Sequence, residues 1–514
     1  MSKASLNIIG GRKAVKVTLL YPPHQSWPEA MVKPNGSLAY PQLGGALMEK
    51  GIEVKVFDAC VGNDKDDLQT TFYRSTPLPS GLLRTGVSDE RILEEVADSH
   101  IIGLTSIFSA QETMVLIAAR LIKKHFPEKL VIAGGVNARA RKHIFLANGF
   151  DLVALTEAEG TIIEICDMVA KDSRDFSDIA SVAYLRDGQI VSTPTSKEAV
   201  VWDLDEHPFP AWELLPNERY WQIGRPHGGV FRPEENIRYA SLMTSLGCIF
   251  ACKYCHIAGE TVGSDSGPIG RFRIKSDERV MREVDNLMKL GVNTVYIEDD
   301  TLFGHKQRAI RLLRKFNQID AGLMCVNGMN IAHLMSRNEP DEEVLKVLSE
   351  AGVRELDLPF ESASPRILAK YCTNKWSVQK FNIPKLIARC RDYGISINGA
   401  FMIGFPDETL EEVQTTVAFA RQMRQAGLNT VSMSIVTPLP GTPLYDYCME
   451  NGNLSPEFNI DKMHWQRANM INTPIPPDEL ERIQREAWET INDQSFTSAK
   501  KAMRPKVDGA QAAG

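Results

Sequence analysis

Short apolar runs alternate with segments of helical periodicity along residues 1–170. Five runs rich in Val, Ile and Leu are typical of strands: VKVTLLYPP, GIEVKVFDA, HIIGLTSIF, KLVIAGG and FDLVALTE. Segments between them, such as QETMVLIAARLIKKHF, repeat apolar residues at helical spacing. Apolar strands separated by helices predict a parallel sheet covered on both faces. We therefore expect a doubly wound α/β domain over residues 1–170.

Polar and glycine residues follow these strands at their carboxyl ends, where such sheets bind ligands. Thr105 and Ser106 offer hydroxyls after the third strand, and Glu157 follows the fifth. Gly134 and Gly135 let the backbone approach a bulky ligand, or they merely form a tight turn into a helix. No G-x-G-x-x-G follows the first strand, so the sequence does not indicate a dinucleotide.

Residues 171–237 break the strand–helix alternation and predict a connecting segment. ASVAYLRDGQIVSTP has the pattern of a hairpin that turns at Asp187-Gly188. DEHPFPAWELLPNERYW is rich in Pro and Trp, which suits an extended strap between domains. We therefore expect a linker that contains a hairpin and a strap.

The alternation resumes over residues 238–450 and predicts about six strand–helix units. Their strands are RYASLMTSL, NTVYIEDDTLF, GLMCVNGMN, VRELDLPFES, ISINGAFMIGFPDET and TVSMSIVTPLPGTPLY. Six units are too few for the closed eight-unit barrel, so we expect an open six-unit partial barrel with its chemistry at the carboxyl strand ends. Residues 451–500 form a helical extension, and the polar tail 501–514 is expected to be disordered.

Three cysteines lie close together in SLGCIFACKYCHIAG, namely Cys248, Cys252 and Cys255. A structural zinc site takes four protein ligands, and a four-iron cluster normally takes four cysteines. Three thiolates on one loop indicate a 4Fe-4S cluster with one iron left open for a small molecule. Two alternatives remain: inert thiols, or a zinc site completed by His256 or by a distant residue.

Composition excludes several other classes. The chain has 514 residues, which predicts two or three domains, and a net charge of −7 that gives no broad basic surface for nucleic acid. No apolar run reaches the length of a membrane span. Nine cysteines without a secretory pattern at MSKASLNIIGGRKAVKV fit a reducing compartment, so we expect a cytoplasmic protein.

The second half resembles the radical S-adenosylmethionine (SAM) superfamily at several separated points. Gly247, the three cysteines and Tyr254 match its cluster loop, Glu361 falls where members place a carboxylate near SAM, and GFPDET and PLPGTPLY resemble its late strand ends. The resemblance implies that SAM binds the open iron through its amino and carboxylate groups and yields a 5′-deoxyadenosyl radical. It also implies that Tyr254 and Glu361 contact SAM. Glu298-Asp299-Asp300 replaces the usual Gly-Gly-Glu.

The first half resembles the cobalamin-binding domain of class B radical SAM methyltransferases. TSIFSAQ, AGG and TEAEG follow corresponding strands, and HPFPAWELLPNERYW is similar to the strap of the phosphonate methylases of fosfomycin biosynthesis. Cobalamin would then lie against Thr105, Ser106, Gly134, Gly135 and Glu157. The cobalt-ligating motif Asp-x-His-x-x-Gly is missing, since Asp58 to Gly62 lack a histidine, and Asn137 stands where members often have histidine. A degenerate domain that no longer binds cobalamin is the alternative.

The resemblance implies a cobalamin-dependent radical SAM methyltransferase. Such an enzyme would methylate an unactivated carbon, or phosphorus, of a small-molecule or natural-product intermediate using SAM and methylcobalamin. It would need an external electron donor such as flavodoxin or ferredoxin. One alternative is a cobalamin-binding radical SAM enzyme that catalyses a cyclisation, ring rearrangement or oxidation without methyl transfer. A more remote alternative is a non-catalytic corrinoid-binding module.

Overall fold

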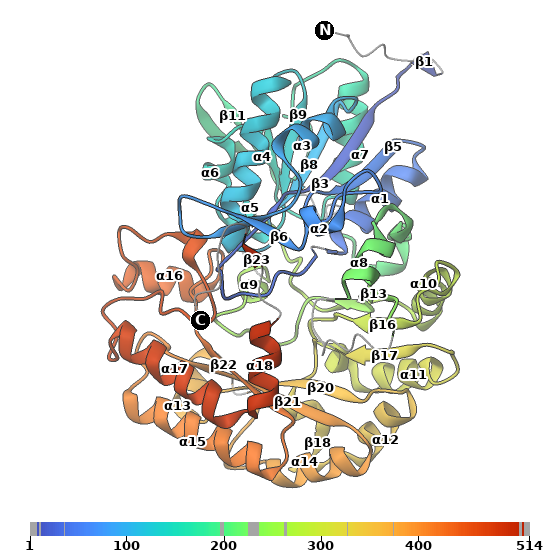
Figure 1. The fold of residues 1–514 in the computed structure, drawn as a ribbon. Helices are drawn as coiled ribbons and strands as arrows, with labels where there is room; N and C mark the ends of the chain where they lie inside the picture. The colour runs from blue at the N-terminus through green and yellow to red at the C-terminus, as the bar shows by residue number, and fades with distance from the viewer. Residues whose placement is uncertain are drawn as a thin grey trace. The chain divides into compact units, whose positions relative to one another are not determined.

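The computed structural model describes residues 8–9, 12–34, 36–195, 200–224, 236–261, 265–325, 327–373, 375–502 and 506–507 (Figure 1). The chain forms two compact units. The first comprises Met1–His227, Val262–Ile269 and Lys501–Gly514, and the second comprises Gly228–Thr261 and Gly270–Lys500. Among the described residues, no helix is both long enough and apolar enough to cross a membrane.

A seven-stranded sheet in the order β12-β11-β10-β9-β8-β3-β5 forms the centre of the first unit. Its five parallel strands are the five predicted from the sequence: β3 (Lys16–Tyr21), β5 (Glu53–Asp58), β8 (Ile101–Thr105), β9 (Leu130–Gly134) and β10 (Leu152–Ala154). The chain order reverses between β3 and β8, which is where open α/β sheets bind ligands. The doubly wound fold class is confirmed.

Helices cover this sheet because their apolar positions recur on one face. In α4 (Glu112–His125), Val115, Ala119 and Ile122 are buried against the strands. The other main helices are α1 (Ala39–Glu49), α3 (Asp89–Val96) and α7 (Glu159–Ala170). Strands β3, β8, β9 and β10 are almost wholly buried, as the unbroken apolar runs predicted, whereas the edge strand β5 is buried only at Phe57 and Asp58.

The predicted hairpin is present, but it extends the sheet of the first unit. Strands β11 (Val182–Arg186) and β12 (Gln189–Ser192) pair antiparallel, and β11 also pairs antiparallel with β10. Asp187 and Gly188 both have positive φ, as a two-residue hairpin turn requires. The hairpin is therefore part of the sheet and not of a free linker.

The strap also packs on the first unit over its described residues 200–224. The Ala211 amide donates to Pro41 O in α1, and Trp212 is buried. A side chain at Gly45 would collide with Phe209 O, so this glycine lets the strap lie close to the helix. At the end of the strap, α8 (Asn217–Ile223) places the Tyr220 hydroxyl 2.8 Å from Asp58 Oδ2.

Six parallel strands form an open sheet in the second unit, in the order β13-β16-β17-β20-β21-β22. Helices α10 (Asp277–Lys289), α11 (Lys306–Phe316), α12 (Glu342–Glu350), α14 (Ile383–Asp392) and α15 (Leu410–Ala426) line one side of it (Figure 1). The predicted six-unit partial barrel is confirmed. Its strands are β13 (Tyr239–Leu242), β16 (Thr294–Ile297), β17 (Gly322–Cys325), β20 (Glu355–Glu361), β21 (Ser396–Ile403) and β22 (Thr430–Ile435).

The helical extension covers the outer edge of β22. Helix α17 (Pro477–Ile491) packs on this strand, and Asn492 exchanges two 2.8 Å hydrogen bonds with the backbone of Val431. These bonds satisfy an edge that would otherwise be open to another strand. Helix α18 (Gln494–Ala502) follows, and β23 (Lys506–Val507) pairs with β6 (Arg74–Pro77). The tail predicted to be disordered thus includes regular structure at residues 501–502 and 506–507, and its other residues lie outside the described part of the chain.

Candidate functional site

The cysteine loop leaves the short strand β14 (Ser245–Leu246) and ends at α9 (His256–Gly259). Gly247 has φ +76°, and a side chain there would lie 2.5 Å from Gly270 O. The Cys248 amide donates to the same carbonyl at 3.1 Å. Only glycine fits this close approach in the left-handed region, so Gly247 sets the path of the loop.

Burial shifts the pKa of two thiols in this loop. It raises the pKa of Cys255 to about 12, and Asp300, Cys252 and Cys248 raise it further. Burial likewise raises the pKa of Cys248. Removing the protons of Cys248 and Cys255 requires a strongly positive partner, such as the irons of a cluster. The third thiol, Cys252, is buried, and its Sγ lies 3.7 Å from Thr373 Oγ1.

The donor set fits an iron–sulfur cluster. Soft thiolate ligands are those that such clusters take. Within the residues that the structure describes, no three His, Cys, Asp or Glu side chains are grouped so as to hold a single metal ion. A four-iron cube binds each cysteine at a different iron, so its ligands need not converge on one point. Cys248, Cys252 and Cys255 would hold this cluster.

Tyr254 and Glu361 lie together, as expected for two residues that share a ligand. The Tyr254 hydroxyl donates to Glu361 Oε1 at 2.5 Å, and Lys375 Nζ donates to the same oxygen at 2.6 Å. Lys375 Nζ also lies 3.2 Å from the Tyr254 hydroxyl. Burial and Glu361 raise the pKa of Tyr254, so the phenol stays protonated. These contacts bring a cation, a phenol and a carboxylate within hydrogen-bond distance of one another.

Glu361 stands at the last position of β20 with φ +60°. The pairing of β20 with β21 shifts register between Pro359 and Glu361. A non-glycine residue held in this conformation costs about 1–3 kcal/mol and persists only where its surroundings enforce it, commonly at functional sites. The strain turns the carboxylate toward Tyr254 and Lys375.

The acidic residues that follow β16 accept hydrogen bonds from the residues that begin the cysteine loop. Asp299 is fully buried and accepts hydrogen bonds from the Thr244 amide, the Thr244 hydroxyl and the Ser245 hydroxyl, each at 2.6 Å. Asp300 accepts from the Gly247 amide at 3.2 Å, and burial raises its pKa to about 6. These two carboxylates hold the residues just before Cys248.

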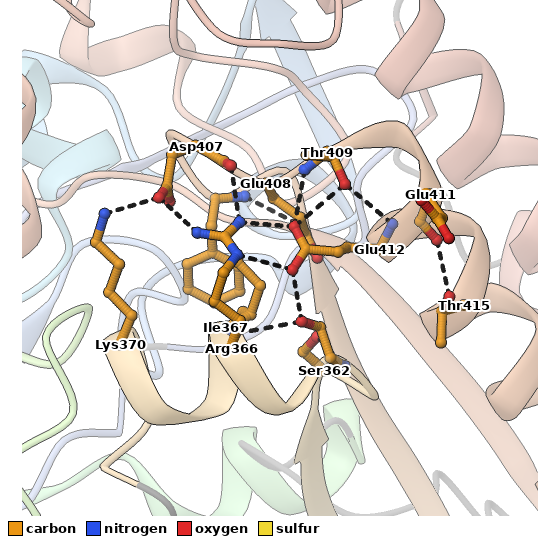
Figure 2. Close-up of polar contacts among 12 residues, drawn as sticks. Ser362, Arg366, Ile367, Lys370, Asp407, Glu408, Thr409, Glu411, Glu412 and Thr415 are labelled. Carbon is orange, nitrogen blue, oxygen red and sulfur yellow. Dashed lines mark hydrogen bonds and ion pairs between the residues drawn. The ribbon is translucent and has the colours of Figure 1, made fainter.

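The GFPDET segment forms a second support for the site. Figure 2 shows Arg366, from α13 (Pro365–Tyr371), between the carboxylates of Asp407 and Glu412. Glu408 accepts the Gly404 and Phe405 amides at 2.6 and 3.1 Å, and burial raises its pKa to about 8. The Phe405 ring meets the Tyr254 ring edge-on at 6.2 Å. The segment therefore orients Tyr254.

An apolar cavity of about 200 Å³ lies at the carboxyl ends of the strands in the first unit. Thr105, Gly134, Gly135 and Glu157 line it. The other lining residues are mainly apolar and come from elements that include β3, α1, β9 and α7, among them Leu19, Leu43, Ile132, Ile162 and Ile165. Gly135 has φ +95°, and a side chain there would lie 2.6 Å from Ser106 O. The lining is mainly apolar, with polar groups such as Thr105 and Glu157.

Ser106 is not among the residues that line this cavity. Its hydroxyl accepts the Asn137 side-chain amide at 3.0 Å, and Asn137 also donates to Glu112 Oε2 at 3.1 Å. Both Ser106 and Asn137 are buried. Ser106 therefore joins the loops after β8 and β9, and Asn137 is part of the same network.

Two residues at these sites escaped the sequence analysis. Lys375 follows α13 in a loop with no recognisable motif. Tyr40 lines the cavity from α1, and its hydroxyl lies 2.6 Å from Leu20 O and 2.8 Å from the Thr105 amide. Tyr40 thereby joins β3 to β8 at the point where the strand order reverses. An aromatic residue on the apolar face of a helix usually belongs to the hydrophobic core, so the sequence alone does not indicate that Tyr40 lines a cavity.

Comparison with known proteins identifies the domain that contains the cysteine loop. Residues 242–420 match the family model described as the radical SAM superfamily. The chain therefore contains a radical SAM domain over these residues. The predictions that it is an enzyme of this superfamily and that it uses SAM and a 4Fe-4S cluster are confirmed.

Two relatives of this radical SAM enzyme match nearly its whole length. An uncharacterized methyltransferase of Pyrococcus horikoshii is 28% identical over 96% of this chain and 94% of its own. Cytidylyl-2-hydroxyethylphosphonate methyltransferase of Streptomyces wedmorensis is 25% identical over 90% and 87%. The predicted resemblance to methyltransferases, including the phosphonate enzyme, is confirmed.

Solved structures share the fold of the radical SAM enzyme. The radical SAM methyltransferase TsrM of Kitasatospora setae, solved with tryptophan and a SAM analogue, has a TM-score of 0.62 and 16% identity over 85% of this chain and 76% of its own. The cobalamin-dependent SAM radical enzyme OxsB, solved with aqua-cobalamin and SAM, has a TM-score of 0.65 and 16% identity over 92% and 66%. Both confirm the predicted two-part architecture as a fold.

Proposed function

We propose that this enzyme is a cobalamin-dependent radical SAM methyltransferase that acts on an unactivated carbon, or on phosphorus, of a small molecule. The observation that carries the proposal is the contact between the three-cysteine loop and a buried ion pair. Tyr254 of the loop donates a hydrogen bond to Glu361, which is paired with Lys375. The cavity of the first unit supports the corrinoid part of the proposal. We assign residues 1–170 to the cobalamin domain and residues 238–450 to the radical domain.

The residues of the second unit would bind and orient SAM. When bound, the cluster would supply one electron for SAM cleavage, and cobalamin would carry the methyl group. Lys375 offers an ammonium to the SAM carboxylate, and Glu361 offers an acceptor to its ribose or ammonium group. Tyr254 keeps its proton and fixes the Glu361 carboxylate. Their burial excludes bulk water, which strengthens their electrostatic contacts to a charged ligand.

The residues of the first unit would hold the corrinoid through shape. Thr105 and Glu157 place polar groups at the rim of the apolar cavity, and Gly134 and Gly135 keep its wall flat. Tyr40 offers an aromatic face from α1. The absence of a histidine between Asp58 and Gly62 means that this segment would give cobalt no imidazole ligand.

We propose a small-molecule substrate, an external one-electron donor such as flavodoxin or ferredoxin, and a cytoplasmic location. The named relative acts on a cytidylyl phosphonate, which supports a small molecule. An oxygen-sensitive cluster and nine cysteines without a disulfide among the described residues suit a reducing compartment.

Anaerobic reconstitution tests the proposal. The full chain is reconstituted with iron, sulfide and cobalamin, and 5′-deoxyadenosine and S-adenosylhomocysteine are measured with candidate substrates. Methyl transfer gives both products, whereas a cyclisation or oxidation gives 5′-deoxyadenosine alone. C252A should lose the cluster and both products, and C390A, in α14 and remote from the loop in sequence, should keep them. A wild-type chain that binds no iron and sulfide contradicts the proposal.

A further inference from the structure

His333 has a buried ring nitrogen that makes no hydrogen bond to any described residue. It lies on the short helix η7 (Ile331–Leu334), which follows β17. The Asn330 amide donates to His333 Nδ1 at 3.2 Å as part of a capping box. Because Nδ1 accepts, a neutral ring carries its proton on Nε2. Nε2 is buried and has no hydrogen-bond partner among the described residues.

The ring is fixed beside the cysteine loop. It stacks on Phe303, with centroids 6.0 Å apart, and lies 5.9 Å from Phe250. Phe250 stands between Cys248 and Cys252, so the imidazole packs on the loop that would hold the cluster. Two aromatic neighbours leave the ring little freedom to turn its N–H toward another protein group.

The surroundings of His333 keep its ring uncharged and favour an anionic acceptor for its N–H. Burial and the positive charge of Lys375 lower the pKa of His333 to about 4, so the ring is uncharged at neutral pH. The same ammonium attracts an anionic group into this region. Thr301, which follows β16, also has a buried hydroxyl without a partner among the described residues. Strands β16 and β17 are parallel neighbours, so both unused groups follow carboxyl strand ends.

We propose that His333 donates its Nε2–H to the methionine carboxylate of SAM and so positions SAM against the cluster. The inference rests on the proposed function, because the carboxylate would reach this loop only by binding the open iron. His333 is a positioning residue: it holds the SAM carboxylate together with Lys375 and takes no part in bond breaking. Donation to a carboxylate is a charge-assisted hydrogen bond, which is stronger than one to a neutral acceptor.

Replacements at position 333 separate the donor from the cap. In H333Q, a glutamine at this capping position can accept the Asn330 amide and still present an N–H. In H333E the cap is kept but the donor is lost, and in H333F the ring packing is kept but the donor is lost. N330A removes the cap to Ala332 and leaves the His333 donor in place.

The measurement is SAM binding to anaerobically reconstituted full-length protein. SAM is titrated alone and followed by calorimetry and by the EPR spectrum of the reduced cluster, after iron content and circular dichroism are matched to wild type. We expect H333E and H333F to bind SAM about 10- to 100-fold more weakly and to lose part of the SAM-induced spectral change. H333Q and N330A should bind within about threefold of wild type.

Each outcome decides a different claim. Wild-type affinity in both H333E and H333F, or an equal loss in N330A, overturns the role of His333. If H333E does not assemble the cluster, H333F alone decides, since it preserves the stacking on Phe303. Failure of the wild-type chain to bind a cluster or SAM contradicts the proposed function instead.

Discussion

The Lys375 ammonium lies 2.6 Å from the Glu361 carboxylate, and both side chains are less than a tenth exposed. Burying two opposite charges is costly unless each satisfies the other. Each side chain of the pair therefore depends on the other to keep its charge buried.

Removing Lys375 alone should destabilise the apo protein. K375M leaves the Glu361 charge buried, which costs about 3–5 kcal/mol when one partner of a buried pair is lost. The double variant E361L/K375M removes both charges and should recover most of this loss. Urea unfolding of the apo protein measures both values. A K375M variant as stable as wild type, or a double variant less stable than K375M, contradicts this dependence.

Gly247 should be irreplaceable for cluster assembly. In G247A the left-handed backbone costs about 1–2 kcal/mol, and the added methyl collides with the carbonyl of Gly270. Gly352 is the matched control, because it also has positive φ (+85°) but meets no atom within 4 Å. We expect G352A to keep full iron content and G247A to lose most of it, as measured by iron and sulfide analysis. Equal iron contents would show that the collision is relieved.

The sheets could be predicted because their signal is local. Each parallel strand of the two sheets is an apolar run that ends near glycine or a polar residue. The existence of each strand and its position along the chain therefore follow from the sequence. The hairpin turn at Asp187 and Gly188 is equally local. The pairing of the hairpin with β10 is not a local feature, because no residue in β10 or β11 indicates which strand will lie beside it.

The site could be predicted only where a motif marks it. The cysteines, Tyr254 and Glu361 stand in recognisable patterns, whereas Lys375 reaches Glu361 from an irregular loop. Ser106 directly follows the end of β8, and its hydroxyl accepts a hydrogen bond from the Asn137 side chain, a contact that no feature of the sequence indicates.

Two adjacent glycines test the corrinoid cavity separately from the fold. G134A adds a methyl where no atom lies within 4 Å, so stability should change by less than about 0.5 kcal/mol. Because Gly134 lines the cavity, cobalamin binding should weaken, which the absorption spectrum after gel filtration measures. G135A should lose both stability and binding, since its methyl meets Ser106 O and φ is +95°. Unchanged cobalamin binding in G134A would place the corrinoid elsewhere.

Glu408 should make the stability of the second unit depend on pH. Burial raises its pKa to about 8 in the folded protein, against 4.5 for a free side chain, so the folded state holds a proton that the unfolded state releases. Its contribution is fully present below pH 4.5 and is lost as the pH rises through about 8. Each unit of pKa difference corresponds to about 1.4 kcal/mol, so the loss should amount to a few kcal/mol.

The E408Q variant isolates this contribution. Glutamine carries no titrating proton and can still accept the amides of Gly404 and Phe405 through its side-chain oxygen. Urea unfolding of wild type should show a midpoint that falls between pH 5 and pH 8, whereas that of E408Q should fall less over the same range. Parallel pH profiles for the two proteins would mean that Glu408 is already ionised in the fold. The two backbone amides would then compensate the burial of its charge.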